Sequence, residues 1–208
     1  MAALVLGLFE GSTPARAGQP VIVAVGDSIT AGFGLSEREA WPAVLAGTLN
    51  KSGTPVTMIN AGVSGDTTAG GRARLAWSLD GTDPKPTAAI VALGGNDALR
   101  ALDPELAYQN LDAILTELKK RKLKILLAGM LAPPNLGPDY GRKFQAIYTR
   151  LAQKHNVLLF PFLLEGVAAD PDLNQADGIH PTAAGQKVIA GNIKPFIEAM
   201  LDGKTAMK

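Results

Sequence analysis

Cysteine is absent from the chain and histidine is scarce, with His155 and His180 as the only two copies. The lack of cysteine excludes disulfides, a thiol nucleophile and cysteine-ligated zinc. Two histidines exclude a three-histidine metal site and leave imidazole chemistry few places to occur. The glycine spacing G-x-G-x-x-G, which marks dinucleotide-binding loops, is missing too. We therefore expect neither a metal nor another cofactor.

Net charge is also small, because 20 lysines and arginines oppose 19 aspartates and glutamates and leave a formal charge of +1. Such a chain has no overall field to attract nucleic acid or an anionic membrane. Its one dense basic cluster, residues 119–124, falls where a helix is expected to end, and the helix dipole favours cations there. No apolar run approaches the roughly 18 residues that a membrane span needs. These features favour a small-molecule substrate, no nucleic-acid partner and no integral membrane association.

The composition suits one globular domain. Apolar residues make up 47% and charged residues 19% of the 208, a length that allows one well-buried core and is too short for two ordinary domains. Residues 2–9 form a short apolar run, and Ala15-Arg16-Ala17 resembles a signal-peptidase site. We predict a partial export signal over residues 1–18 and one domain over residues 19–208. This predicts a periplasmic or secreted protein; because no basic residue precedes the apolar run, a cytoplasmic location stays open as the alternative.

Five short apolar segments rich in β-branched residues predict β-strands. They cover residues 21–25, 56–61, 88–93, 124–131 and 157–163. Helical patterns alternate with them: one after Arg38, one over residues 69–79, one after Asp103-Pro104, one over residues 140–154, and a last one beginning at Pro181. This alternation predicts an α/β protein, a three-layer α/β/α sandwich with right-handed crossovers.

Polar, glycine-containing turns follow four of these segments. They are Gly-Asp-Ser at 26–28, Val-Ser-Gly-Asp at 63–66, Gly-Gly-Asn-Asp at 94–97 and Asp-Gly-Ile-His-Pro at 177–181. Ligands of a doubly wound parallel sheet bind outside the carboxyl ends of its strands. We therefore expect the four turns to meet at one edge of the sheet.

Each turn supplies a group that acyl transfer needs. The hydroxyl of Ser28 requires a base, which His180 can provide, and Asp177 is placed to orient the other ring nitrogen of that histidine. A tetrahedral intermediate needs uncharged donors near its oxyanion, for which the Ser28 N–H, the Gly65 N–H and the Asn96 amide are candidates. The G-x-S-x-G elbow of α/β-hydrolases is absent, which favours another serine-hydrolase fold.

These blocks resemble a known family. GDSIT at 26–30, SGD at 64–66, GGND at 94–97 and DGIHP at 177–181 are similar to the four signature blocks of the SGNH-hydrolase superfamily, the GDSL esterases and lipases. The connecting sequence over about residues 20–200 looks especially like bacterial arylesterases and the acyl-thioesterase and lysophospholipase branch. Ile29 stands where the family name has leucine, a change from one apolar residue to another.

The resemblance implies a flavodoxin-like sandwich with a five-stranded parallel sheet in the order 2-1-3-4-5. It implies Ser28 as nucleophile, Asp177 and His180 as the rest of the triad, and Gly65 and Asn96 in the oxyanion hole with the Ser28 N–H. The implied activity is that of a serine esterase acting on aryl esters and short or medium acyl esters, with acyl thioesters and lysophospholipids as further candidates.

A loop rich in proline and glycine, residues 131–141, follows the fourth predicted strand. Its composition is typical of a loop that borders a pocket, and we expect substrate contacts from Leu131, Pro133, Leu136 and Tyr140. The alternative is that this loop only connects a strand to a helix.

Other interpretations of the polar residues stay open at this point. Ser28 alone would be read as a helix cap, and Asn96 as an ordinary turn residue. We interpret Asp27, Asp66 and Asp97 as residues that brace their loops, and His155 as a structural residue at a helix end. Two other functions compete with the esterase: a carbohydrate O-acetylesterase of the same superfamily, and a non-catalytic binding module with a flavodoxin-like fold.

Overall fold

The structure is a computed structural model that describes residues 18–204, so most of the predicted export signal lies outside the described residues. At its centre is a parallel five-stranded sheet in the order β2-β1-β3-β4-β5, as the sequence predicts. The strands are β1 (Val21–Gly26), β2 (Thr57–Gly62), β3 (Ala88–Ala92), β4 (Lys124–Ala128) and β5 (Leu158–Phe160).

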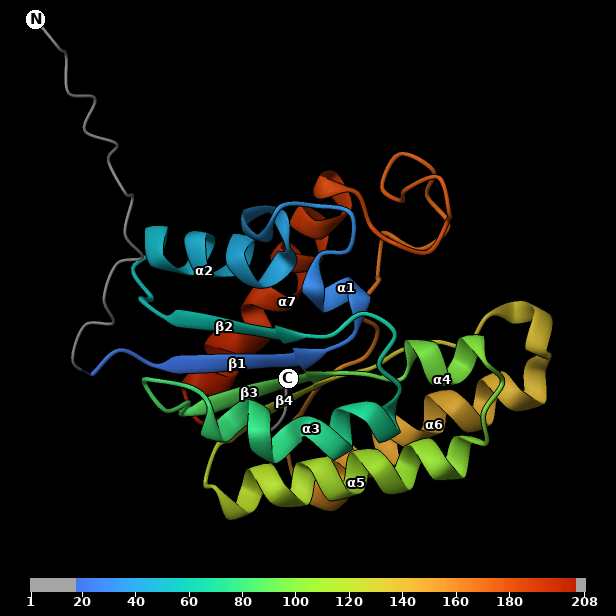
Figure 1. Ribbon diagram of the computed structural model, residues 1–208, viewed down its shortest axis with the longest axis horizontal. Coiled ribbons are helices and arrows are strands. Elements are labelled where there is room, and N and C mark those ends of the chain that lie inside the picture. The colour runs from blue at the N-terminus through green and yellow to red at the C-terminus, as the bar shows by residue number, and fades with distance from the viewer. Residues whose placement is uncertain (1–17, 205–208) are drawn as a thin grey trace, which may run out of the picture.

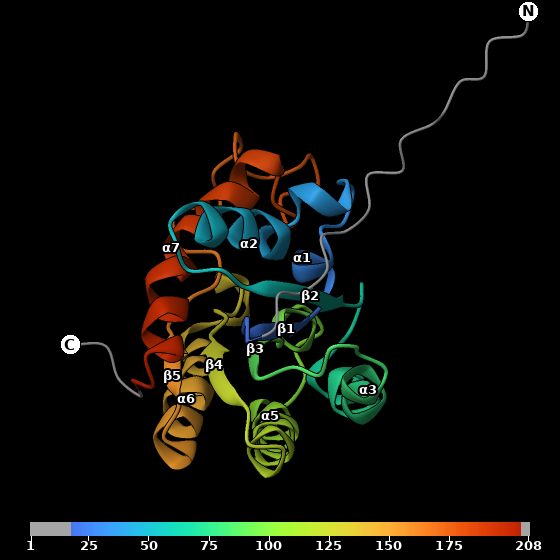
Figure 2. The same ribbon diagram turned by 90° about the vertical axis from the view of Figure 1, so that its left-hand side faces the viewer.

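Helices cover both faces of the sheet (Figures 1 and 2), with α2 and α7 on one face and α3, α5 and α6 on the other. The helices are α1 (Ser28–Ala31), α2 (Trp41–Lys51), α3 (Thr68–Asp80), α4 (Gly95–Leu99), α5 (Pro104–Lys120), α6 (Pro138–His155) and α7 (Ala183–Leu201). Because both faces are covered, every residue of β1 and β3 is buried, whereas the edge strand β2 is half-buried throughout. The predicted three-layer sandwich is confirmed.

The strand register explains why the polar turns meet. Gly26 at the end of β1 pairs with Gly62 of β2 and with Ala92 of β3, so these three strands end level with one another. The arrowheads of β1 and β2 in Figure 1 point to the side where α1 and α4 lie. The turns after β1, β2 and β3 therefore emerge together at the carboxyl edge of the sheet.

Strands β4 and β5 each end three residues earlier than the sequence predicts. The Gly129 N–H, just after β4, still donates to the Phe160 carbonyl at 2.7 Å. The next residue of β5 would be Pro161, which has no N–H to continue the ladder. Strand pairing therefore ends at residues 128 and 160, and not at the predicted residues 131 and 163.

The last helix begins later than predicted. Pro181 is not its first residue but pairs with Asn174 in an isolated antiparallel bridge. Thr182 caps the helix instead, because its hydroxyl oxygen accepts the N–H of Gly185 at 3.3 Å. The short helices α1 and α4, of four and five residues, were not predicted.

A buried glutamine joins helices from opposite ends of the chain. Gln186 of α7 is 1% exposed; its side-chain oxygen accepts the Trp41 N–H at 2.8 Å, and its amide donates to the Ile29 carbonyl at 3.1 Å. Trp41 opens α2, whose N-cap residue Ala40 offers no side-chain acceptor. Gln186 therefore satisfies the start of α2 and ties α1 to α7. Within residues 18–204, none of the helices has the length and apolarity to cross a membrane.

Candidate active site

Ser28 is the first residue of α1, directly after the turn that ends β1. The turn is tight, because a Cβ on Gly26 would lie 2.0 Å from the Thr30 hydroxyl oxygen. Asp27 caps the helix by accepting the Ile29 N–H at 3.0 Å. The glycine and the aspartate thus start a helix immediately at the strand end and place the serine hydroxyl at the edge of the sheet.

Three side chains form a row at this edge. The Ser28 Oγ lies 2.9 Å from His180 Nε2, and His180 Nδ1 lies 2.6 Å from the Asp177 Oδ2. An aspartate at Nδ1 holds the proton on that nitrogen, which leaves Nε2 free to accept the serine proton. The structure therefore brings together three residues from opposite ends of the chain in an arrangement that can activate a hydroxyl.

The loop around Asp177 keeps its carboxylate ionised. The other carboxylate oxygen accepts backbone N–H groups of Ile179 at 2.9 Å and His180 at 3.0 Å. The hydrogen bond from the His180 ring, followed by these two backbone bonds, holds the pKa of Asp177 well below its usual range. Asp177 therefore carries a negative charge beside the imidazole wherever the protein is folded near neutral pH.

The three predicted oxyanion donors emerge at the same edge. Within residues 18–204 the backbone N–H groups of Ser28 and Gly65 have no backbone acceptor. Gly65 has φ +84°, a left-handed conformation that favours glycine, and its carbonyl accepts Arg100 Nη2 at 3.1 Å. The Asn96 amide donates one N–H to the Asp66 carbonyl at 2.9 Å. Because an amide has two N–H donors, the second stays available to an oxyanion.

Asp66, whose carbonyl accepts the Asn96 amide, is itself held in place by Arg74. Arg74 Nε pairs with Asp66 Oδ2 at 2.5 Å, and its Nη2 donates to the Gly26 carbonyl at 2.9 Å. One guanidinium thus ties the turn after β2 to the turn that carries Ser28. The loop-bracing role predicted for Asp66 agrees with this contact, whereas no role was predicted for Arg74.

Asp97 and His155 also hold neighbouring elements together. Asp97 accepts the Thr68 N–H at 2.8 Å and the Thr68 hydroxyl at 2.6 Å, which fixes the start of α3. His155, the last residue of α6, places Nε2 2.7 Å from Asp112 of α5. Both contacts agree with structural roles.

Asp27 directly precedes Ser28, and its carboxylate is buried. It is 2% exposed, and burial raises its pKa to about 6. Its side chain accepts the Ile29 N–H and lies near Gly95, where an added Cβ would be 3.3 Å from the carboxylate. The Asp27 carboxylate therefore caps the start of α1, in agreement with the loop-bracing role interpreted from the sequence.

An apolar hollow of about 400 Å³ lies beside this edge. None of the residues of 18–204 that line it is charged, and its walls come from the segments after β1, β3, β4 and β5. The lining residues are Ile29, Gly95, Leu99, Met130, Leu131, Ala132, Pro133, Pro134, Phe162, Leu164, Ala168, Ala169, Asn174, Gly178 and Ile179. Of the four predicted substrate contacts, Leu131 and Pro133 line this hollow. Leu99, Met130 and Ile179 also line it, although the sequence analysis did not single them out.

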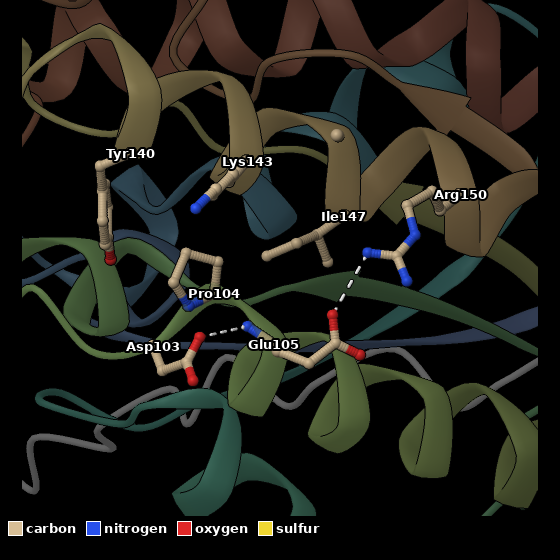
Figure 3. Close-up of a pocket in the computed structure, with 8 residues that line it drawn as sticks. Asp103, Pro104, Glu105, Tyr140, Lys143, Ile147 and Arg150 are labelled. Atoms are coloured by element: carbon tan, nitrogen blue, oxygen red, sulfur yellow. Dashed lines mark hydrogen bonds and ion pairs between the residues drawn. The ribbon is translucent and has the colours of Figure 1, made fainter.

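Leu136 and Tyr140 do not line this hollow, which differs from the expectation. The chain turns at Gly137, with φ +82°, and begins α6 at Pro138. Tyr140 therefore faces a second, charged hollow of about 550 Å³ between α5 and α6, together with Lys143 (Figure 3). Its hydroxyl donates to the Leu102 carbonyl at 2.7 Å.

The sheet order and the hydroxyl–imidazole–carboxylate row at its carboxyl edge are characteristic of the SGNH class of hydrolases. The GDSL-like lipase/acylhydrolase family matches residues 24–188, and the chain belongs to that family. It is therefore a carboxylic ester hydrolase.

Relatives with assigned activities are similar over most of the chain. An arylesterase of Vibrio mimicus is 35% identical over 187 residues, which cover 90% of this chain and 92% of the relative. A protein of Escherichia coli named thioesterase 1/protease 1/lysophospholipase L1 is 39% identical over 169 residues, 81% of this chain and 79% of that protein. The crystal structure of AlinE4, an SGNH-hydrolase family esterase, superposes with a TM-score of 0.75 at 49% identity, covering 90% of this chain and 99% of that one.

Proposed function

We propose that Ser28, His180 and Asp177 are the catalytic triad of a serine esterase that works through an acyl-enzyme. The observation that carries this proposal is the continuous row from the Ser28 Oγ through the His180 ring to Asp177, at 2.9 Å and 2.6 Å. His180 Nε2 takes the serine proton while Oγ attacks the ester carbonyl carbon, and the carbonyl π electrons move to its oxygen.

The oxyanion formed in that step is stabilised by the Ser28 N–H, the Gly65 N–H and the free amide N–H of Asn96. The bond to the leaving alcohol or thiol then breaks, and the leaving group takes the proton from His180. Water attacks the acyl-serine in the same way, giving the carboxylic acid and restoring the Ser28 hydroxyl. Asp177 stabilises the imidazolium that forms in each half of the reaction.

We propose aryl esters and short or medium acyl esters as substrates, with acyl thioesters and lysophospholipids as further members of the same class. The uncharged walls of the apolar hollow, including Leu131 and Pro133, support an apolar acyl group. The names of the arylesterase and of the thioesterase/lysophospholipase relative support the same class. Among the described residues of the walls, Asn174 alone has a hydrogen-bonding polar side chain, so these walls lack a cluster suited to a sugar, which disfavours the carbohydrate O-acetylesterase.

Kinetics of Ser28→Ala with p-nitrophenyl esters test the mechanism. We expect ester hydrolysis to be lost while the circular dichroism and melting temperature stay those of the parent, because Ser28 lies at the edge of the sheet. Near-normal turnover by the alanine variant would refute the triad. The parent protein is also assayed with acetylated xylan as the comparison substrate. Efficient deacetylation of xylan with negligible aryl-ester turnover would favour the O-acetylesterase. No turnover of any ester by the parent protein would favour the binding module.

We further propose that residues 1–18 are a partial export signal and that residues 19–208 are the catalytic domain. The apolar run at residues 2–9 and the Ala15-Arg16-Ala17 sequence support this division. A chain that begins at residue 19 should keep full esterase activity. Cell fractionation with N-terminal sequencing tests export, and an uncleaved protein confined to the cytoplasm would contradict it.

A further inference from the structure

An aromatic ring lies against the imidazole of His180. The centroids of the Phe33 and His180 rings are 4.5 Å apart, with 35° between the ring planes. Phe33 follows the short helix α1, and it is 49% exposed although large apolar side chains are normally buried. The side chain of His180 is only 17% exposed. Phe33 thus shields the histidine on one side while remaining open to solvent itself.

Gln175 ties the segment that carries Phe33 to the loop that carries His180. Its side-chain amide donates to the Phe33 carbonyl at 2.7 Å and to the Pro181 carbonyl at 3.1 Å. Its backbone N–H donates to the His180 carbonyl at 2.7 Å. One glutamine therefore holds the backbone on either side of the contact between the two rings.

The adjacent glycine shows how closely the two segments approach. Gly34 has φ +76°, and a Cβ there would lie 2.6 Å from the side-chain oxygen of Gln175. A side chain at position 34 would therefore push the glutamine away from the Phe33 carbonyl. The glycine at position 34 thus leaves the space that the Gln175 side chain occupies.

The turn that carries His180 sets only part of the geometry of the histidine. His180 lies in the connection between β5 and α7, the orange loop of Figure 1, and Asp177 belongs to the same exposed turn. That turn can orient the imidazole relative to Asp177, but it cannot by itself set the distance to Ser28, which belongs to α1. Contacts between the two segments set that distance: Gln186 joins α1 to α7, and Gln175 joins the residues next to the histidine itself. Such contacts matter because catalytic groups work only when held close to their productive geometry.

We propose that Phe33 and Gln175 are positioning residues for the catalytic histidine: Gln175 joins the two segments, and the Phe33 ring fixes the plane of the His180 imidazole. This inference rests on the proposed triad. Neither residue donates or accepts a proton in the reaction. Their contribution is to keep His180 Nε2 within hydrogen-bond reach of the Ser28 hydroxyl.

Phe33→Ala tests the ring contact with a short p-nitrophenyl ester. We expect kcat to fall about tenfold to a hundredfold with KM changed less than about twofold, since a misplaced base slows chemistry without removing substrate contacts. Phe33→Tyr should restore most of the loss because it keeps the ring. Trp77→Ala is the matched control: Trp77 is another exposed aromatic residue, 79% exposed on α3, and its removal should leave kcat unchanged.

Gln175→Glu tests the tie between the segments. A carboxylate has the size of the amide but cannot donate to the two carbonyl oxygens, so kcat should again fall about tenfold or more with KM nearly constant. Gln145→Glu, at an exposed position of α6, controls for the added charge. A raised KM with unchanged kcat in Phe33→Ala or Gln175→Glu would overturn the proposal in favour of a substrate contact, and unchanged kinetics would overturn it outright.

Nuclear magnetic resonance gives a readout that does not depend on turnover. With only two histidines in the chain, the ring signals of His180 and His155 can be assigned by substitution. Phe33→Ala should remove the ring-current shift of the His180 signals and broaden them, while the His155 signals stay fixed. Unchanged His180 signals would refute the contact. If Ser28→Ala instead keeps its turnover, the triad fails, and this spectrum still tests the packing of Phe33 on His180.

Discussion

Asn96 joins the turn after β3 to the turn after β2, because one of its amide N–H groups is bound to the Asp66 carbonyl. In the proposed mechanism, the second N–H acts only when charge develops on the substrate oxygen. Asn96→Ala should therefore lower kcat about 10²- to 10³-fold with little change in KM. Steady-state kinetics on a p-nitrophenyl ester measure this. A large rise in KM with kcat unchanged would instead indicate that Asn96 binds the ground-state substrate.

Asp27 makes the stability of the protein depend on pH. Burial raises its folded pKa to about 6 from an ordinary value of 3.8. The unfolded chain therefore loses this proton at lower pH than the folded chain does, and the free energy of unfolding falls as the pH rises from about 4 to about 6. The full loss is up to about 3 kcal/mol, at 1.4 kcal/mol per pKa unit.

Asp27→Asn removes this titration and keeps an acceptor for the Ile29 N–H. The free energy of unfolding of the variant, relative to the parent, should therefore increase across pH 4 to 6. Urea denaturation at several pH values measures the difference. Parallel pH profiles for the two proteins would mean that burial does not raise the pKa of Asp27.

At the scale of elements, only part of the loop after β4 lines the apolar hollow. Leu131 lines the apolar hollow, whereas Leu136, in the same loop, does not. Leu131→Trp should fill part of the hollow and lower kcat/KM for decanoyl esters about tenfold relative to acetyl esters, since each methylene that cannot be buried costs about 0.8 kcal/mol.

Leu136→Trp is the matched control for that experiment and should leave the chain-length profile as it is. The two variants are compared over p-nitrophenyl esters from acetate to decanoate. Identical profiles for both would mean that the hollow does not receive the acyl chain, and that the loop after β4 is only a connection between β4 and α6.

The sequence predicted the elements whose patterns are long enough to read. The buried strands β1 and β3 are continuous apolar runs, and α5 repeats apolar residues at helical spacing, so their positions follow from local sequence. Helices α1 and α4 contain four and five residues, too few for a period to appear. Their starts are set by Asp27 and by Gly94, whose φ of 122° favours glycine.

At the scale of the whole molecule, the four signature turns could be placed at one edge because parallel strands end together. The contacts of Arg74, Gln175 and Gln186 could not be predicted in this way. Each joins segments that are far apart along the chain, and no local pattern marks a polar side chain that will be bound from a distance. The same reason explains why Tyr140, predicted as a substrate contact, lies outside the apolar hollow: after the turn at Gly137 it faces the hollow between α5 and α6.

Gln186 provides a test of how the molecule is tied together. Gln186→Met keeps the length of the side chain but leaves the Trp41 N–H and the Ile29 carbonyl without their partner. Each unsatisfied buried group costs about 1–3 kcal/mol, so with two such groups the variant should lose about 2–6 kcal/mol of unfolding free energy. Urea denaturation measures this, with Gln153→Met at an exposed position of α6 as control. A loss of unfolding free energy no larger than that of the control would mean that the packing of α1, α2 and α7 does not depend on the Gln186 hydrogen bonds.

The identity of the nucleophile is the central claim, and labelling with a fluorophosphonate followed by peptide mass spectrometry tests it most directly. The reagent forms a covalent bond to an activated serine oxygen and releases fluoride, so the adduct marks the attacking atom. We predict one adduct, on the peptide that carries Ser28, formed at a rate that falls sharply in His180→Ala and absent in Ser28→Ala. An adduct on another residue, or undiminished labelling of Ser28→Ala, would contradict the account.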